Sequence, residues 1–594
     1  MHTEDRPLSI VFNGEIFNYI ELREELIRKG HKFTTRSDTE VILHLYQQEG
    51  EECVQRLNGQ WAFAIWDAIQ KKLFLSRDRL GVRPLFYTRT PTSFLFASEI
   101  KALLACPDVP RELDLQGLDQ IFTFWVTLPP RTAFRNVWQL PPAHSLVVED
   151  GYIRIWQYWH LDFAPGNPTV TGKDEERQAE ELLALLLDAT RIRLRADVPV
   201  GAYLSGGLDS TLVAALARKC AGERLRTFSV GFSDAEFDES GFQKEAVAFL
   251  KTRHSHVQCL REDIARAFPE VIWHAEQPIL RTAPAPLFLL SRLVRDGGYK
   301  VVVTGEGADE ILGGYDIFKE AKIRRFWGRV SGSSLRPLLL KRLYPYMESI
   351  QRQPSAYLEK FFHVSPQNLA SPFFSHLPRW ELTAKLKTFL SDTTRAGIGP
   401  PSALSELERQ LPLSFPSWDP FHQAQYLETG WLLPGYILSS QGDRMAMAHS
   451  VEARHPFLDH RVVQFAATLP PRLKMKVLNE KYLLKKAARD LVPERIRRRP
   501  KQPYRAPEGP SLLGPDSAYL EEMLSPERIR RDAIFDVHKV EALVRKFKRQ
   551  LPTGTADNMA LIGILSTEIL LDRFMNPCGA ADMSCRARCE VPTP

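Results

Sequence analysis

Two glycine-rich acidic segments of the sequence could bind a nucleotide and a metal ion. The first is Ser205-Gly206-Gly207-Leu208-Asp209-Ser210, and the second is Gly305-Glu306-Gly307-Ala308-Asp309-Glu310. Glycines let the backbone approach a ligand closely, and the free N–H groups at the start of a helix favour an anion such as phosphate. An aspartate there repels phosphate unless a divalent cation lies between them, and Mg²⁺ usually binds one or two carboxylates together with phosphates. The two segments therefore predict a site for a magnesium-bound nucleotide.

The flanking elements place both segments at one edge of a predicted parallel sheet. The apolar run 198–204 predicts a strand before the first segment, and 300–304 predicts a strand before the second. Further strands are predicted over 226–232 and 256–259, with helices between them, as in an α/β domain with a Rossmann-like sheet. Ligands bind beyond the carboxyl ends of such strands. The residues expected on this rim are 205–210, Val230 and 304–310.

Each segment alone has a simpler interpretation. Ser-Gly-Gly could be a strand-to-helix turn, and Gly-Glu-Gly could be an acidic turn. The longer Ser-Gly-Gly-x-Asp-Ser string is more specific, and an acidic segment after a second strand favours the nucleotide site. No Gly-x₄-Gly-Lys-Ser/Thr string occurs, since Gly172-Lys173 is followed by Asp174, so a P-loop enzyme has no support.

The bulk composition indicates a globular protein of two or more domains. Its 594 residues exceed one ordinary core, and 44% hydrophobic and 25% charged residues are typical values. The net charge of +6 needs no polyanionic partner, and no apolar run is long enough to span a bilayer. Seven scattered cysteines favour a reducing cytoplasm. We expect a cytoplasmic protein with small-molecule substrates, no nucleic-acid or membrane partner, and a possible homodimer.

The first hundred residues predict short strands and two helices, as in an α+β domain. A strand over 8–12 ends at a turn, helices follow at 20–29 and from Ser37, and 61–77 predicts a hairpin. An Asn-Gly pair alone is usually a hairpin turn, but several ordered strings are more specific. The four strings are 12–18 (FNGEIFN), 37–40 (SDTE), 77–85 (RDRLGVRPL) and 97–103 (ASEIKAL).

In this order the strings resemble the N-terminal-nucleophile glutaminase domain of glutamine-hydrolysing asparagine synthetases. The resemblance implies a type 2 glutamine amidotransferase sandwich in which Asn13 and Gly14 form the oxyanion hole. It also implies that Glu15 and Asp38 bind the amino acid end of glutamine. An amide and a backbone N–H can stabilise an oxyanion, and carboxylates can pair with an ammonium group, so the residue types suit these roles.

The chain departs from this family at its first residues. The family nucleophile is a cysteine directly after the initiator methionine, whereas His2 stands here, and the family's upstream glutamine-binding arginine has no counterpart. Cys53 has no family motif around it. We expect Met1 to be an internal methionine of a longer ancestor or a miscalled start, the remaining sheet to have an unpaired edge, and the chain to depend on ammonia.

The second half also carries a family resemblance. The Ser-Gly-Gly-x-Asp-Ser string resembles the pyrophosphate-binding loop of ATP pyrophosphatases, and strings at 443–459 and 479–484 resemble the ligase domain of the same synthetases. This resemblance implies ATP and Mg²⁺, with Asp209 and Asp309 as metal ligands. Glu306 would be an acid/base or amine-orienting group, and Lys481 would neutralise charge at the α-phosphate.

Residues at the predicted strand ends are implied to hold the nucleotide. Leu204, Val230 and Gly305 would contact the nucleoside. A basic run at 495–501 could bind nucleic acid, although a local role near phosphate is the simpler interpretation. The implied ATP-binding residues are Leu204, Ser205, Gly206, Gly207, Asp209, Ser210, Val230, Thr304 and Gly305.

The expected organisation is a partial amidotransferase domain over 1–163, a Pro/Gly linker, and an ATP-pyrophosphatase domain over 174–575 with a helical C-terminal part. Residues 576–594 would form a tail whose three cysteines make only a weak zinc motif.

The expected reaction is amidation of aspartate through β-aspartyl-AMP, with release of AMP and pyrophosphate. Alternatives are a related adenylating amidotransferase or β-lactam-synthetase-like enzyme with another acceptor, and an inactive truncated product. A tRNA-modifying pyrophosphatase would leave the first half unexplained.

Overall fold

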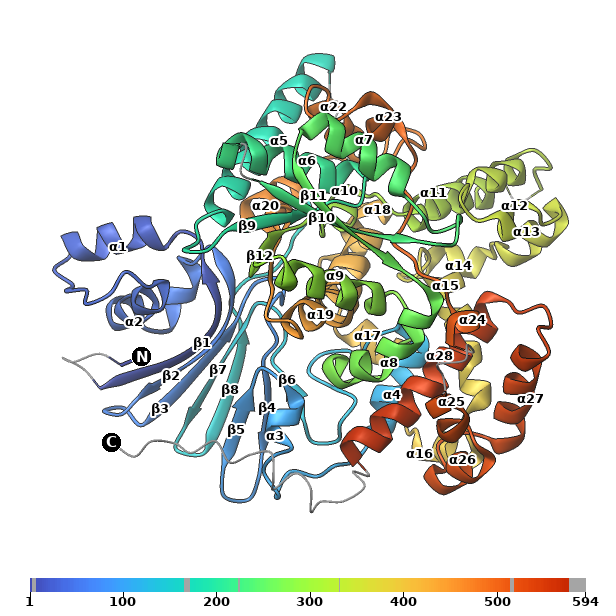
Figure 1. Cartoon of the computed structure of the whole chain (residues 1–594), viewed down its shortest axis with the longest axis horizontal. Helices are drawn as coiled ribbons and strands as arrows, with labels where there is room; N and C mark the ends of the chain where they lie inside the picture. Colours follow the sequence, from blue (N-terminus) through green and yellow to red (C-terminus); the bar gives the residue numbers. More distant parts are fainter. Residues whose placement is uncertain (3–6, 165–170, 223–224, 331, 513–517, 576–594) are drawn as a thin grey trace.

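The computed structural model describes residues 1–2, 7–164, 171–222, 225–330, 332–512 and 518–575. Two β-sheet regions and a large set of helices make up this part of the chain (Figure 1). Most of the expected linker and the whole expected C-terminal tail lie outside the described residues. Of the helices described, none is both long and apolar enough to cross a membrane.

The N-terminal part is built on two antiparallel sheets. The larger has the order β1-β2-β3-β7-β8, and the smaller has the order β5-β4-β6. The expected hairpin is present, with β2 paired to β3. The strands are β1 (Leu8–Ile16), β2 (Gly59–Asp67), β3 (Lys72–Arg77), β4 (Phe86–Arg89), β5 (Phe94–Ala97), β6 (Trp138–Gln139), β7 (His144–Glu149) and β8 (Tyr152–Gln157).

Alternation along the strands lets the larger sheet bury both faces. Side chains such as Ile10 and Phe63 pack with the helices α1 (Tyr19–Arg28) and α2 (Asp38–Glu49). Their neighbours, such as Ala64 and Leu75, face the opposite way and pack with the smaller sheet. The two sheets and the helix layer therefore form the sandwich expected from the sequence.

Strand β1 forms an edge of the larger sheet. It pairs with β2 on one side, and on the other Met1 and Ile10 exchange hydrogen bonds of 3.1 Å and 2.8 Å. Val11 remains 60% exposed on this strand. The expected open edge is thus present, but Met1 covers part of it.

The second part is organised by a parallel sheet with the order β11-β10-β9-β12-β13. Every neighbouring pair is parallel, as the alternation of strands and helices predicts. The fifth strand, β13, was not predicted as a strand, because its three residues lie far along the chain inside a helical region. The strands are β9 (Val200–Tyr203), β10 (Arg226–Phe232), β11 (Arg253–Cys259), β12 (Val301–Val303) and β13 (Glu452–Arg454).

Helices cover both faces of the parallel sheet. On one face α5 (Gly172–Arg193) and α6 (Leu208–Ala221) share a core with Ala202 and Val303. On the other, α8 (Arg261–Ala275) and α9 (Pro284–Asp296) pack with Phe228 and Val302. Other helices of this part are α7 (Ser240–Leu250), α10 (Ala308–Leu312), α19 (Arg444–Met447), α20 (His460–Thr468), α21 (Pro471–Lys474) and α22 (Tyr482–Ala487).

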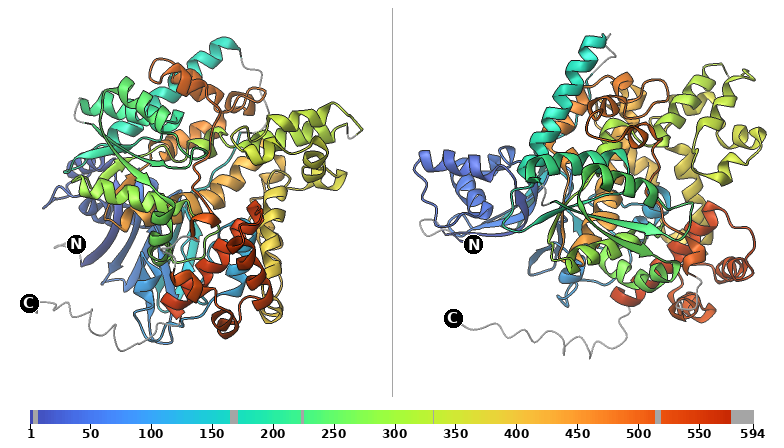
Figure 2. Two further views of the ribbon diagram at one scale, coloured as in Figure 1. Left: turned by 45° about the vertical axis from the view of Figure 1, so that its right-hand side comes forward. Right: turned by 45° about the horizontal axis from the view of Figure 1, so that its top comes forward.

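Further helices lie on the side of the parallel sheet that is away from the larger N-terminal sheet. In Figures 1 and 2, α11–α14 are drawn in yellow-green and α24–α28 in red. A π-helix, η6 (Glu428–Asp443), leads back to the sheet. The remaining helices are α11 (Asp316–Gly328), α12 (Glu348–Gln351), α13 (Ser355–Phe361), α14 (Pro366–Ala370), α15 (Leu377–Ala384), α16 (Asp392–Gly397), α17 (Ala403–Arg409), α18 (Pro420–Leu427), α23 (Glu494–Arg498), α24 (Gly509–Leu512), α25 (Ala518–Met523), α26 (Pro526–Asp532), α27 (Val537–Lys548) and α28 (Thr555–Leu570), with α3 (Ile100–Leu103) and α4 (Leu115–Phe124) in the N-terminal half.

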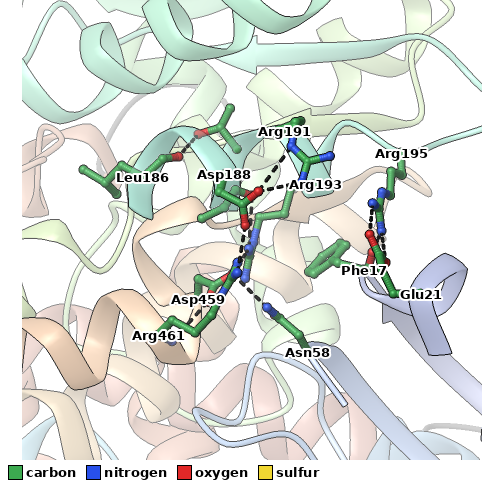
Figure 3. A network of polar contacts seen from close by, with 12 residues as sticks. Phe17, Glu21, Asn58, Leu186, Asp188, Arg191, Arg193, Arg195, Asp459 and Arg461 are labelled. Atoms are coloured by element: carbon green, nitrogen blue, oxygen red, sulfur yellow. Dashed lines mark hydrogen bonds and ion pairs between the residues drawn. The ribbon is translucent and has the colours of Figure 1, made fainter. Parts of the chain in front are cut away.

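A buried ionic network joins the two parts (Figure 3). The carboxylate of Asp459 accepts hydrogen bonds from Arg193 at 2.8 Å, from Arg461 at 2.9 Å and from Asn58 of the N-terminal part at 3.0 Å. Burial alone would raise the pKa of Asp459, but Arg193 and Arg461 more than offset it and the pKa is lowered. Arg195 extends the contact to the carbonyl of Phe17.

We predict that Asp459→Asn lowers the free energy of unfolding at pH 7 by about 3–5 kcal/mol, because it leaves buried Arg193 without its counter-ion. Since the pKa of Asp459 is lower in the folded than in the unfolded chain, this contribution is present above about pH 4 and is lost as the pH falls below it. Urea unfolding at pH 7, 5 and 3.5 measures both effects. Asp392→Asn is the control, because Asp392 is 95% exposed; equal losses in the two variants would contradict the assignment.

Candidate active sites

The loop between β9 and α6 forms a turn whose backbone N–H groups could bind an anion. Gly206 has φ of 76°, a left-handed conformation that favours glycine, and a Cβ there would lie 2.6 Å from the backbone nitrogen of Gln243. The hydroxyls of Ser205 and Ser210 lie 2.9 Å apart, and the Ser210 hydroxyl accepts from the Ser205 N–H at 3.1 Å. Helix α6 begins after Gly207 without a side-chain cap. Its first N–H groups are thus available to an anion.

Two aspartates and two lysines meet beside this turn. The ammonium of Lys481 lies 2.7 Å from a carboxylate oxygen of Asp209 and 2.7 Å from one of Asp309. The ammonium of Lys501 lies 2.6 Å from the other oxygen of Asp309 and 3.8 Å from Asp209. Both aspartates and Lys481 are buried. We call Asp209, Asp309, Lys481 and Lys501 the charge quartet.

The lysines control the ionisation of Asp309. Burial alone would raise the pKa of Asp309, but the charges of Lys481 and Lys501 lower it to about 2. In turn, burial opposes the charge on Lys501 while Asp309 and Asp209 favour it, and the pKa of Lys501 is raised. Asp309 and Lys501 are therefore both charged at neutral pH.

Close packing brings the two glycine-rich segments together. A Cβ on Gly305 would lie 2.8 Å from the backbone nitrogen of Ser210. A Cβ on Gly314 would collide with the carboxylate of Asp309. The absence of these side chains lets the ends of β9 and β12 share one rim, as the sequence predicts.

Glu306 lies on the same rim beside a buried histidine. The hydroxyl of Thr304 is 2.7 Å from Nδ1 of His455, and Oε2 of Glu306 is 3.8 Å from the same nitrogen. Burial raises the pKa of Glu306 above its usual range, although a hydrogen bond with Thr304 opposes the shift. Burial lowers the pKa of His455 to about 3, so its imidazole is neutral. This pair offers a carboxyl group and a neutral imidazole for proton handling.

The expected nucleoside contacts are less open than the phosphate loop. Leu204 is buried with α6, and its N–H donates to the Phe228 carbonyl at 2.9 Å. Val230 is buried on the α8 and α9 side, two residues before the end of β10. Their role with the nucleoside stays a prediction.

The expected oxyanion residues lie on β1. The side-chain amide of Asn13 donates to the Ser98 hydroxyl at 3.2 Å. Gly14 has φ of 148°, and a Cβ there would collide with the Gln60 carbonyl. The position thus accepts only glycine. The bond between Asn13 and Ser98 brings two of the recognised sequence strings to one place in the N-terminal part.

Glu15 and Asp38 also lie together at this place. Asp38 accepts from the Ile16 N–H at 2.9 Å, and burial raises the pKa of Asp38. Glu15 forms an ion pair of 3.0 Å with Arg454 from β13 of the other part. Burial raises the pKa of Glu15 to about 7 despite Arg454.

The two buried cysteines of the described part do not supply a reactive thiolate at the Asn13 site. Cys53 is buried among apolar side chains below the sheet, and burial raises the pKa of its thiol strongly. Cys259 is buried in the second part, where burial raises the pKa of its thiol to about 12. Thiolates are the nucleophilic form, so these groups are unreactive.

Three residues that the fold brings to these sites are not predicted from the sequence. Lys501 belongs to the basic run at 495–501, and the fold pairs it with Asp309. His455 and Arg454 belong to the string at 443–459, in which no residue is predicted to have a role at either site. No local pattern could single them out, because their partners are more than a hundred residues away.

Two protein-family models match the chain. The model described as "Asparagine synthase" covers residues 181–571, and the model described as "Glutamine amidotransferase domain" covers residues 1–159. The chain belongs to the asparagine synthase family. The resemblance seen in the sequence is thereby confirmed, and the fold class with it. The chain is an ATP-dependent carbon–nitrogen ligase of the glutamine amidotransferase type.

Named relatives cover most of the chain. Asparagine synthetase [glutamine-hydrolyzing] 1 of Bacillus subtilis is 33% identical over 85% of this chain and 76% of its own length. Asparagine synthetase [glutamine-hydrolyzing] 3 of the same organism is 32% identical over 90% and 81%. Amidase chyE of Penicillium rubens is 29% identical over 98% and 88%.

The donor set of the charge quartet suits a magnesium ion carried with ATP. Oxygens of Asp209 and Asp309 converge on one cation, the ammonium of Lys481. Within the described residues, no group of three or more His, Cys, Asp or Glu side chains could hold a metal alone. Phosphate oxygens would have to complete the coordination, as is usual for magnesium.

We predict that Gly305→Ala weakens binding of a non-hydrolysable ATP analogue about 10-fold or more, because added atoms in a packed contact cost about 1–3 kcal/mol. The new methyl group would force Gly305 away from Ser210 and separate the two segments. Calorimetric titration with magnesium measures the affinity. Gly241→Ala is the control, since nothing lies within 4 Å of a Cβ there; equal affinities in both variants would refute the close contact.

Proposed function

We propose that this ligase converts aspartate to asparagine through a β-aspartyl-AMP intermediate. An oxygen of the aspartate side chain forms a bond to the α-phosphorus of ATP, and the bond to the β-phosphate oxygen breaks, releasing pyrophosphate. Ammonia then forms the carbon–nitrogen bond as the carbon–oxygen bond to AMP breaks. The observation that carries the proposal is the charge quartet beside the turn between β9 and α6.

Each group of the charge quartet would have a distinct role in this reaction. Asp209 and Asp309 would hold magnesium, which neutralises phosphate charge when it is bound. Lys481 and Lys501 bridge the aspartates now, and with ATP present their ammonium groups can turn to the phosphates, where negative charge grows in the transition state. Buried cations are effective there because little water screens them.

Glu306 suits the second half-reaction. The attacking nitrogen becomes positively charged and must lose a proton. A carboxylate with a raised pKa is a better base than an ordinary one, and Glu306 lies on the rim next to Thr304. We therefore assign proton acceptance to Glu306, with neutral His455 holding Thr304 in place.

We predict that the chain forms AMP, pyrophosphate and asparagine in equal amounts from ATP, L-aspartate and ammonium chloride with magnesium. Asp309→Ala should lower kcat about 100-fold or more, because it removes one of two charges that position the metal-bound phosphates. Chromatography of nucleotides and amino acids measures the products. Asp296→Ala, an exposed aspartate, should leave the rate unchanged; full activity in Asp309→Ala would contradict the metal assignment.

We also propose that the 594-residue chain takes its nitrogen from ammonia. The oxyanion residues Asn13 and Gly14 are retained, but an acyl-enzyme needs a nucleophile, and neither buried thiol described above can act as one.

The corresponding prediction is that glutamine gives neither glutamate nor asparagine above the uncatalysed rate, while ammonium supports synthesis. Cys53→Ser should behave like the wild type with both donors, because its thiol has no part in the reaction. Enzymatic glutamate determination tests this. Glutamate release that no cysteine substitution abolishes would show that the first site works by another route.

A second candidate keeps the adenylation and changes the acceptor. The relative chyE is named an amidase, and its match extends over 98% of this chain. A related amidotransferase or a β-lactam-synthetase-like enzyme would adenylate the carboxylate of a different acceptor and so would also release AMP. Comparing L-aspartate with a panel of carboxylic acids decides between them. Absence of AMP with every acid would favour an inactive product.

We propose the division of the chain at 163 and 174, which the extents of the two family matches support.

A further inference from the structure

The segment that follows Lys501 runs along the carboxyl edge of the parallel sheet. Lys501 itself reaches Asp309 of the charge quartet. Gln502 donates to the Glu236 carbonyl at 3.2 Å, in the loop after β10. The hydroxyl of Thr282, just before α9, donates to the Pro507 carbonyl at 2.7 Å. Arg505 lies between these anchor points, four residues after a lysine of the nucleotide site.

The guanidinium of Arg505 is held between two aromatic rings but is short of hydrogen-bond partners. It lies 5.2 Å from the ring centre of Phe237 and 5.1 Å from that of Tyr346. One nitrogen, Nη1, donates to the Glu236 carboxylate at 3.2 Å. Nε and Nη2 are shielded from solvent and have no hydrogen-bond partner. Arg505 is the only arginine in the described part with two such nitrogens.

The free Nε and Nη2 groups lie along one edge of the guanidinium. The two donors on this edge match the two oxygens of a carboxylate. Elsewhere in this chain, Arg261 uses the same edge on Asp234, with bonds of 3.0 Å and 2.6 Å. Paired bonds of this kind fix a planar anion in position. Shielded donors without acceptors are unfavourable. An incoming carboxylate would therefore gain more from Arg505 than from a solvated arginine.

The surrounding charges favour a small monoanion over a polyphosphate. Glu236 lies on the other nitrogen of the guanidinium. Asp316, which is buried and paired with Lys319 at 3.1 Å, lies next to Tyr346. Two carboxylates this near oppose the charge of a phosphate chain, whereas they can attract the ammonium group of an amino acid.

We propose that Arg505 binds the non-reacting carboxylate of the acceptor and selects an amino acid substrate. This inference rests on the proposed adenylation at the charge quartet. With the α-carboxylate of aspartate on Arg505, the side-chain carboxylate is free to face the α-phosphate. Arg505 is a binding residue and takes no part in bond making.

The test measures binding of L-aspartate and of its α-amide, L-isoasparagine, to protein saturated with magnesium and a non-hydrolysable ATP analogue. The wild type should prefer L-aspartate. Arg505→Gln should weaken L-aspartate binding about 10- to 100-fold and abolish the preference, as expected for loss of two charged hydrogen bonds. Arg505→Lys should restore part of the affinity. Affinity for the ATP analogue should stay within about two-fold, because Arg505 lies outside the charge quartet.

Arg498→Gln is the matched control, since Arg498 belongs to the same basic run and is 73% exposed. Unchanged L-aspartate affinity in Arg505→Gln, or an equal loss of the ATP analogue, would overturn the proposal. So would a wild type that binds L-aspartate and L-isoasparagine equally, or binds neither. AMP formation by the wild type is measured in parallel and tests the adenylation separately, because binding to Arg505 can be scored whether or not product appears.

Discussion

Burial of charge at the rim of the parallel sheet is the constraint on which the rest of the structure depends. Two carboxylates and an ammonium group removed from water are tolerated only when they lie within hydrogen-bond distance of one another. Asp209 and Asp309 come from the first turns of α6 and α10, which follow β9 and β12, whereas Lys481 and Lys501 come from much later in the chain. The sheet, the helices over it and the returning segment must therefore all be in place before these charges can be buried.

The need to pair buried charges also explains how the two parts of the chain pack together. The ten residues from 452 to 461 contact both sites. Arg454 pairs with Glu15 through its side chain, while its carbonyl accepts from the Thr304 N–H at 2.9 Å. Asp459 bonds to Asn58 and Arg193 across the boundary. This short segment therefore connects the Glu15 site of the N-terminal part with the rim of the parallel sheet at Thr304 through a few ion pairs and hydrogen bonds.

Much of the fold could be predicted because its signals are local. Apolar runs predicted β1, the β2–β3 hairpin and four strands of the parallel sheet, and Ser-Gly-Gly and Gly-Glu-Gly marked the turns after β9 and β12. The strand β13 could not be recognised, since three residues carry no periodic pattern and their pairing with β12 is non-local. The rim was anticipated from a general rule for parallel sheets. Val230 is buried two residues before the end of β10, which lies at Phe232 as predicted, and its role with the nucleoside stays a prediction.

By itself the sequence determined the family, the two kinds of domain, and which aspartates and glycines follow β9 and β12. Gly14 and Gly206 have positive φ angles, and because this conformation favours glycine, the residue type in the string already indicates it. Only the tertiary structure decided which cations face Asp309, that Glu15 meets Arg454, and that Arg505 keeps two donors free. An ion pair between distant segments forms only where the fold brings the two segments together. The order of residues within one segment does not specify which other segment lies beside it.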